Sequence, residues 1–315
     1  MQTRSLGSSG IDVGALGLGC MGMTFAYDIS EQDDAASIEV IHRALDIGVD
    51  LLDTADAYGP LTNEELVGKA IRGRRDEAVI ATKCGVVSSP DFNHGRNASP
   101  DYIRDSCEGS LRRLGVDAID LYQLHRVDPL TPIEESWATF AALVAEGKVR
   151  AIGLSEVTLD ELKRCQAIHP VSSVQSELSL WTRDWTVDVL PWCRDNNVAF
   201  LAFSPLGRGF LTGAMTGRHF AADDFRSTLP RFSPEAMTAN QALVDSVTEI
   251  AGRLDATPAQ VALAWVLAQG PEVIPIPGTK KVSRLLENAA AADLTLSAED
   301  LRTLEELPPV TGGRY

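Results

Sequence analysis

Residues 49–59 read VDLLDTADAYG, and this stretch decides the fold. An apolar run of strand length, from Val49 to Leu52, is followed at once by polar residues that include Asp53 and Tyr58. This pattern is typical of a buried strand whose carboxyl end opens into a loop. The same arrangement recurs twice further along the chain.

Two later strands also end in ionisable residues. Residues 78–83, AVIATK, end on Lys83, and residues 118–125, AIDLYQLH, end on His125. In a parallel barrel the carboxyl ends of the strands meet on one face, where the active site lies. Taken singly, each residue is better explained as a cap, a rim residue, a solvated strand end or a core histidine. Four such residues at three successive strand ends predict a catalytic group.

The catalytic hypothesis rests on complementary roles for these four side chains. A free tyrosine has a pKa of about 10, and we expect the Lys83 ammonium to lower the pKa of Tyr58 toward neutral pH. Asp53 would keep the lysine charged in a partly dry pocket, and His125 would orient a substrate oxygen. Such a group would donate a proton to a carbonyl oxygen, and the motif contains neither a nucleophile nor a set of metal ligands. A cofactor must then supply the electrons.

Strand and helix signals alternate along the chain. Residues 3–13 predict a β-hairpin, residues 15–22 a first barrel strand, and residues 33–47 a helix with clear start and stop signals. Strands are also predicted at 78–83, 118–124, 149–154, 172–176, 198–203 and 273–277. Helices are predicted at 62–72, 100–114, 131–146, 158–168, 185–196, 235–254, 258–269, 282–291 and 298–307. Capping boxes are expected at Thr62 with Glu65 and at Thr158 with Glu161.

Eight strands that alternate with helices predict an α/β fold, a (β/α)8 TIM barrel with an N-terminal β-hairpin and extra C-terminal helices. We expect one domain over residues 1–315. The rival architecture is a doubly wound open sheet. Its GxGxxG turn is absent after the first strand, where GLGCMG has the wrong spacing.

The composition of the chain excludes some classes of binding partner and favours one cellular compartment. The net charge of −16 argues against binding of nucleic acid or an anionic membrane. The five cysteines are odd in number and have no CxxC spacing, which favours free thiols in a reducing cytosol over disulfides or a metal site. The N-terminus lacks the apolar core of a signal peptide, and the apolar stretch near residue 261 is too short to span a bilayer. A cytoplasmic protein is predicted, and its oligomeric state is left open.

The motif DTADAYG, with Lys83 and His125, resembles the catalytic tetrad of the aldo-keto reductases. GLSE (153–156), VQSELSLWTRD (174–184), AFSPLGRGFLTG (202–213) and IPIPGTKK (274–281) with ENAA (287–290) resemble that family's nicotinamide-cofactor segments, in the same order. The similarity extends from about residue 3 to residue 307 and is greatest to the perakine reductase-like branch. It implies that Asp53, Tyr58, Lys83 and His125 are catalytic and that the hairpin plugs the bottom of the barrel.

The resemblance also implies that NADP(H) lies extended across the barrel mouth. Strand-end residues would hold the nicotinamide amide, although many members have an asparagine at the position of Glu156, and a carboxylate accepts but cannot donate. The amides of SPLGRG (204–209) suit a pyrophosphate. A cationic helix start at Lys280 and Arg284 suits the adenosine 2′-phosphate, which favours NADPH. The implied cofactor residues are Met21, Gly22, Asp53, Ser155, Glu156, Gln175, Phe203, Ser204, Pro205, Leu206, Arg208, Gly209, Gly278, Thr279, Lys280, Arg284, Glu287 and Asn288.

The expected function is NADPH-dependent reduction of an aldehyde or ketone to the alcohol. Two alternatives remain, namely an NAD(P)-dependent alcohol or sugar dehydrogenase and a cofactor-sensing regulatory subunit of the same fold. An apolar surface at Met23, Phe25, Phe92 and Phe210 would suit a hydrophobic carbonyl substrate, or these residues are ordinary loop packing. The tail after Leu307 is expected to contribute little to the pocket.

Overall fold

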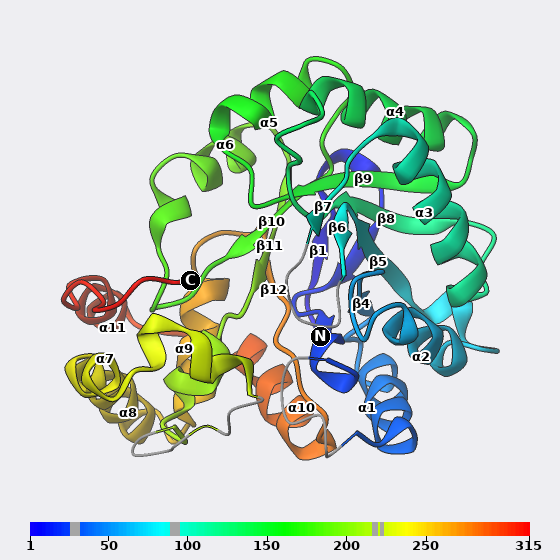
Figure 1. The fold of residues 1–315 in the computed structure, drawn as a ribbon. Coiled ribbons are helices and arrows are strands. Elements are labelled where there is room, and N and C mark those ends of the chain that lie inside the picture. Colours follow the sequence, from blue (N-terminus) through cyan, green and yellow to red (C-terminus); the bar gives the residue numbers. More distant parts are fainter. Residues whose placement is uncertain (26–31, 89–94, 216–219, 221–223) are drawn as a thin grey trace.

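The computed structural model describes residues 1–25, 32–88, 95–215, 220 and 224–315 (Figure 1). Eight parallel strands form one sheet in the order β12-β11-β10-β9-β8-β5-β4-β3. Neighbours in the sheet are also neighbours in the predicted series, so that series is confirmed. The strands are β3 (Leu18–Gly19), β4 (Leu51–Asp53), β5 (Val79–Cys84), β8 (Ile119–Leu124), β9 (Val149–Ser155), β10 (Ser173–Glu177), β11 (Ala199–Phe203) and β12 (Val273–Pro275).

The first and last strands meet and close the sheet. The amide of Gly17 donates to the carbonyl oxygen of Pro275 at 3.0 Å, and the amide of Gly19 donates to that of Pro277 at 3.2 Å. A Cβ atom on Gly19 would lie only 2.9 Å from the carbonyl oxygen of Ile276. Glycine is therefore needed where the two edges approach. The predicted (β/α)8 barrel is confirmed.

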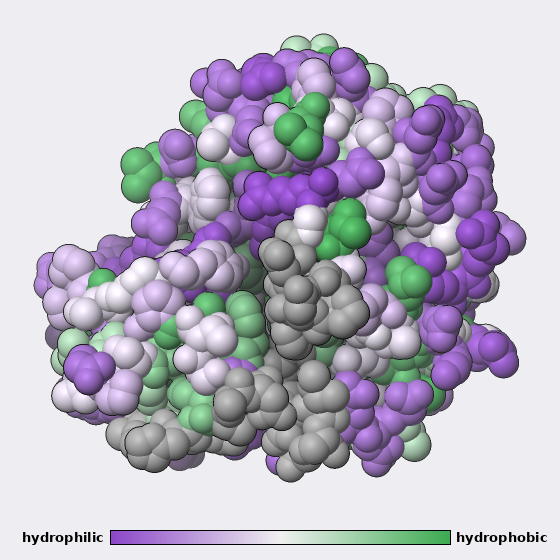
Figure 2. All heavy atoms as spheres, viewed as in Figure 1, coloured by the Kyte–Doolittle hydropathy of each residue, from purple (hydrophilic) through white to green (hydrophobic). Residues whose placement is uncertain are grey.

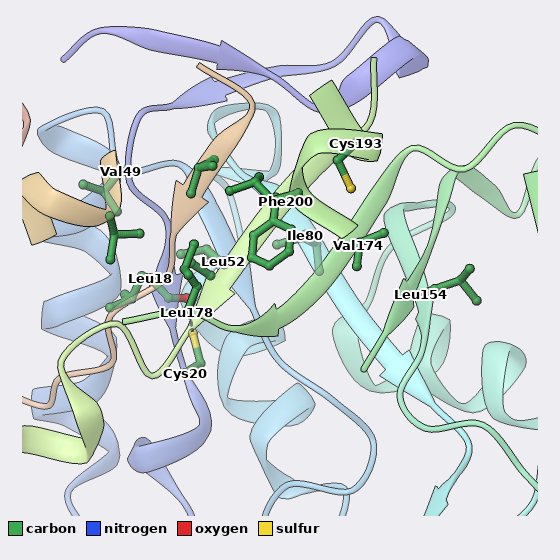
Figure 3. Close-up of a cluster of buried hydrophobic side chains, with 14 of the residues drawn as sticks. Leu18, Cys20, Val49, Leu52, Ile80, Leu154, Val174, Leu178, Cys193 and Phe200 are labelled. Carbon is green, nitrogen blue, oxygen red and sulfur yellow. Dashed lines mark hydrogen bonds between the residues drawn. The ribbon is translucent and has the colours of Figure 1, made fainter. Parts of the chain in front are cut away.

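The strand side chains divide between two apolar clusters. Leu52, Ile80 and Phe200 belong to the larger cluster, between the sheet and the helices (Figure 3). Their neighbours in the sequence fill the interior of the barrel, because side chains alternate between the two faces of a strand. The inward set is Leu51, Ala81, Leu121, Ala151, Ala199, Leu201, Ile274 and Ile276.

The N-terminal hairpin closes the bottom of the barrel, as expected from the resemblance. Its strands β1 (Thr3–Ser5) and β2 (Asp12–Gly14) pair antiparallel. Leu6, Ile11 and Val13 are buried against the inward strand residues. Two further short strands, β6 (Val86–Val87) and β7 (Gly95–Arg96), pair antiparallel within the segment expected to be a loop. Phe92, proposed as a pocket residue, falls outside the described residues.

Helices surround the sheet (Figure 1), and hydrophilic side chains cover much of their outer surface (Figure 2). Among the described residues, no helix is both long and apolar enough to cross a membrane. All five cysteines are buried free thiols. The helices are α1 (Asp34–Asp46), α2 (Thr62–Ala70), α3 (Pro100–Leu114), α4 (Ile133–Ala145), α5 (Leu159–Gln166), α6 (Val189–Asp195), α7 (Pro234–Ala239), α8 (Gln241–Arg253), α9 (Pro258–Leu267), α10 (Val282–Ala289) and α11 (Ala298–Glu305).

Two local predictions about helices need correction. The capping box at α5 is confirmed, but the one at α2 is wrong, because Leu61 precedes that helix with a left-handed φ of 69° and the Thr62 hydroxyl donates to Gly59 instead. The predicted helix 235–254 is divided into α7 and α8 at Asn240. The side-chain amide of Asn240 exchanges two hydrogen bonds with the backbone of Thr311, so the C-terminal tail is fastened at this break.

Candidate active site

A cavity of about 800 Å³ opens at the carboxyl ends of the strands. The alternation of side chains along each strand decides which polar residues face this cavity. Asp53 and Lys83 lie two positions beyond the inward residues Leu51 and Ala81, and Gln175 lies two positions beyond Ser173 at the start of β10. These side chains therefore point toward the barrel axis at its open end. The size suits a site that encloses small molecules.

Lys83 is the centre of the predicted catalytic group. Its ammonium, which is fully buried, donates to Oδ1 of Asp53 and to the carbonyl oxygen of Thr54, both at 2.7 Å. It also lies 3.4 Å from the Tyr58 hydroxyl. The second oxygen of Asp53 accepts from Nε2 of Gln175 at 2.7 Å. The carboxylate thus fixes the lysine on one side and the glutamine on the other.

Tyr58 lies between two other rings. His125 packs edge-on against it, with ring centroids 5.7 Å apart. Phe25 stacks beside it at 6.4 Å. Tyr58, His125 and Phe25 all line the cavity, whereas Lys83 lies behind the wall. The four predicted catalytic residues are therefore brought together, with Tyr58 and His125 facing the open space.

Burial and the neighbouring charges together shift the pKa values of Tyr58 and Lys83. Burial raises the pKa of Tyr58 above its ordinary value of 10.0, and the nearby Lys83 ammonium only partly opposes this. The expected net lowering of the Tyr58 pKa is therefore wrong. Burial alone would lower the pKa of Lys83, but Asp53 and Tyr58 raise it to a net value above 10.5. A protonated phenol beside a charged ammonium is the state that a proton donor requires.

The segment after β11 forms a strained turn at the other side of the cavity. Ser204, Arg208 and Gly209 all have positive φ, of 48°, 53° and 96°. Gly207 shares this conformation, and a Cβ atom there would lie 2.7 Å from the Trp181 ring. Residues with left-handed backbone in a short run turn their amides toward one side, which suits an anion.

The hydrogen bonding of Arg208 also indicates a site for an anionic ligand. Its Nη2 donates to Oε2 of Glu177 at 3.0 Å. Its Nη1 is buried and has no hydrogen-bond partner within the described part of the chain. Because a buried charged donor without a partner is costly, this atom fits a ligand oxygen. Arg208 lines the cavity beside Leu206 and Gly209.

The structure places most of the predicted cofactor residues around this one cavity. Three lie outside its lining, namely Ser155, Glu156 and Glu287, and an arginine donates to each of them. Ser155 accepts from Arg126, Glu156 from Arg314, and Glu287 from Arg284. The predicted residues that do line the cavity are Met21, Gly22, Asp53, Gln175, Phe203, Ser204, Pro205, Leu206, Arg208, Gly209, Gly278, Thr279, Lys280, Arg284 and Asn288.

The apolar pocket prediction is confirmed only for Phe25. Met23 is buried in the main core. Phe210 stacks on Trp181 with centroids 4.3 Å apart, and neither ring lines the cavity. Phe210 and Met23 are therefore packing residues, the alternative left open by the sequence.

The C-terminal tail reaches the cavity, contrary to expectation. Tyr315 lines it and lies under the guanidinium of Arg208, 5.2 Å from that group. Arg314 pairs with Glu156 and lies 3.7 Å from Glu177. No local pattern in the tail signals this contact. Arg126, by contrast, follows His125 directly at a strand end, which is a signal that could have indicated it as a pocket residue.

A closed parallel barrel with a half-buried tyrosine beside a buried Lys83–Asp53 pair at its open end is typical of a class, the barrel enzymes whose chemistry takes place at the strand ends. Within the described ranges, no three His, Cys, Asp or Glu side chains could hold a metal ion. The model of the aldo/keto reductase family matches residues 15–308. This chain belongs to the aldo/keto reductase family, and it is an oxidoreductase.

Individual relatives agree with this assignment. A soybean protein (Glycine max) described as probable aldo-keto reductase 1 is 44% identical, over 100% of this chain and 92% of that protein. The structure of the glycerol dehydrogenase from Gluconobacter oxydans has a TM-score of 0.88 and 32% identity, over 96% of this chain and 94% of that one. An aldo/keto reductase from Klebsiella pneumoniae, in complex with NADP and acetate, has a TM-score of 0.76 and 29% identity, over 100% and 99%.

Proposed function

We propose that this protein reduces an aldehyde or ketone to the alcohol with NADPH, and that Tyr58 donates the proton. The observation that carries this proposal is the Lys83 ammonium, held by Asp53 at 2.7 Å and lying 3.4 Å from the Tyr58 hydroxyl. An ammonium in that position stabilises the phenolate that remains after proton transfer. A phenol without it would be a weak acid.

The residues around the cavity fit a nicotinamide dinucleotide. NADPH, when bound, supplies a hydride to the carbonyl carbon. The left-handed turn at 204–209 and the unpartnered Nη1 of Arg208 suit its pyrophosphate. Lys280 and Arg284 suit a 2′-phosphate at the other end. The related Klebsiella enzyme was solved with NADP, which supports the same cofactor here.

The four catalytic side chains then have distinct tasks. Tyr58 protonates the oxygen that gains charge, and Lys83 stabilises the resulting phenolate. Asp53 keeps Lys83 charged and, through Gln175, ties this pair to the sixth barrel strand, β10. His125, edge-on to Tyr58, orients the carbonyl oxygen toward the phenol. Proton donation of this kind contributes about 10² to 10⁴ in rate.

The test is consumption of NADPH by the purified protein with a generic aldehyde such as 4-nitrobenzaldehyde. We expect turnover with formation of the alcohol in equal amount. Binding of NADPH without any turnover across a panel of aldehydes and ketones would instead support a cofactor-sensing subunit and overturn the proposal.

A second candidate is oxidation of an alcohol, since the two directions share one transition state. It is favoured by the similarity to a glycerol dehydrogenase at 32% identity. Comparing NADP⁺ reduction by glycerol with NADPH oxidation by glyceraldehyde at the same pH separates the candidates. The reductase proposal requires the larger kcat/KM for the aldehyde.

We further propose that residues 1–315 form one catalytic domain and that the protein is cytoplasmic, as five buried free thiols suit a reducing compartment. The position of Glu156 in GLSE supports placement in the perakine reductase-like branch.

A further inference from the structure

We propose that Arg126 forms a carboxylate subsite in the active site, so that the preferred substrates are aldehydes or ketones that also bear a carboxylate. This inference rests on the proposed carbonyl reduction and names the class of its substrate. It concerns two cavity-lining cations, Arg96 and Arg126, that neither the mechanism nor the cofactor uses.

Arg126 is held beside the catalytic group by neutral acceptors. Its Nη1 donates to the carbonyl oxygen of His125 at 2.6 Å and to the Ser155 hydroxyl at 3.0 Å. The residue lines the cavity next to His125, and its positive charge acts on the Tyr58 phenol. The guanidinium is therefore fixed in place while its remaining N–H groups are left for a ligand.

Three other cavity arginines each have a carboxylate close by. The nearest charged distances are 3.0 Å from Arg208 to Glu177, 2.6 Å from Arg226 to Asp224 and 2.6 Å from Arg284 to Glu287. Over the described residues, no carboxylate lies within 4.0 Å of the guanidinium of Arg126. Its charge is therefore not matched from within this part of the protein.

Arg96 increases the positive charge at the same end. Its Nη1 donates to the carbonyl oxygen of Val127, two residues beyond His125, at 3.1 Å. The only acidic residue in the described lining is Asp53, and Lys83 neutralises it at 2.7 Å. In a chain of net charge −16, two cations thus face the substrate end of the cavity. Such a local excess attracts anions.

The remaining lining narrows the substrate class. Phe25, Ala57 and Val86 are apolar, and Phe25 stacks beside Tyr58. A guanidinium binds a carboxylate through two parallel hydrogen bonds. A compact, largely apolar carbonyl compound with one carboxylate, such as a formylbenzoate, would place its ring on the apolar wall and its charge on Arg126.

The test compares 2-, 3- and 4-formylbenzoate with their methyl esters, which keep the aldehyde and remove the charge. We expect the wild type to favour the acid over the ester for at least one isomer, by about tenfold or more in kcat/KM. In Arg126→Met the acid-to-ester ratio should fall by about tenfold through the KM of the acid. Arg126→Lys should retain part of the preference, because it keeps the charge.

The control is Arg104→Gln on the exposed side of α3, which removes one positive charge away from the cavity and should leave the ratio unchanged. A wild type that favours the esters would overturn the inference, as would an Arg126→Met variant that loses acid and ester activity equally. The latter would mean that Arg126 only positions His125. Failure of the wild type to reduce any acid or ester would instead reject the proposed function itself.

Discussion

The carboxylate of Glu156, at the end of β9, accepts hydrogen bonds from the guanidinium of Arg314, 158 residues later in the chain. Nε of the same arginine lies 3.7 Å from Oε2 of Glu177. Two acidic residues at adjacent strand ends are thus bridged by one cation from the tail. Glu156 therefore anchors the tail in this protein.

Removing this cation should destabilise the protein. Arg314→Met leaves Glu156 and Glu177 close together with less compensating charge, so we expect a loss of about 1–3 kcal/mol in the free energy of unfolding. Urea denaturation of Arg314→Met, Glu156→Gln and the double variant measures the coupling, expected at about 0.5–3 kcal/mol. Strictly additive losses would show that the ion pair contributes nothing.

Tyr58→Phe removes the proposed proton donor and keeps the ring. We expect kcat to fall by about 10² to 10⁴, with NADPH affinity unchanged in a fluorescence titration. The matched control is Tyr102→Phe, which deletes a tyrosine hydroxyl on α3 outside the cavity lining. Full turnover by Tyr58→Phe would reject the mechanism.

Lys83→Met leaves Asp53 buried without its cation. We expect a loss of about 3–5 kcal/mol in unfolding free energy, since an unpaired buried charge is costly, together with a large loss of kcat. The double variant Asp53→Asn/Lys83→Met should recover much of the stability and none of the activity. If that variant regained turnover, Lys83 would have no role in proton donation.

Asp56 should make the protein less stable at alkaline pH. Burial raises the pKa of Asp56 to about 8, and Oδ1 has no hydrogen-bond partner within the described residues. In the unfolded chain this carboxyl ionises near pH 4. The folded state holds a proton that the unfolded state has released, so stability falls as pH rises from about 4 to 8.

Asp56→Asn removes this pH dependence while keeping a neutral side chain of similar shape. We expect the variant to gain stability relative to the wild type between pH 5 and pH 9, as measured by thermal unfolding. A difference in Tm that does not vary with pH would show that Asp56 is already ionised in the folded protein.

Arg284→Ala tests the preference for NADPH. Arg284 is exposed, lines the cavity and pairs with Glu287 at 2.6 Å. We expect the KM for NADPH to rise by about ten- to a hundredfold, because a charge-assisted hydrogen bond to the 2′-phosphate is lost. The KM for NADH should change far less. Equal increases for both cofactors would place the 2′-phosphate elsewhere.

Short-range patterns accounted for most of the fold. The order of the strands, the N-terminal hairpin and the extent of α3 follow from periodicity, turn residues and caps that lie within a few residues of one another. The place of the hairpin at the bottom of the barrel came from the family resemblance. One error has a local cause and the other a long-range one. The cap of α2 failed because Leu61 takes a left-handed conformation, and the helix after residue 233 breaks where Asn240 binds the tail.

By itself, the sequence determined the barrel and the identity of the four residues at its strand ends, because strand alternation and strand-end chemistry are encoded in contiguous stretches. Only the tertiary structure decided the state of Tyr58, the bond from Gln175 to Asp53, and the contacts of Arg314 and Tyr315. The physical reason is that burial and long-range ion pairs arise only when the barrel closes and brings distant segments together.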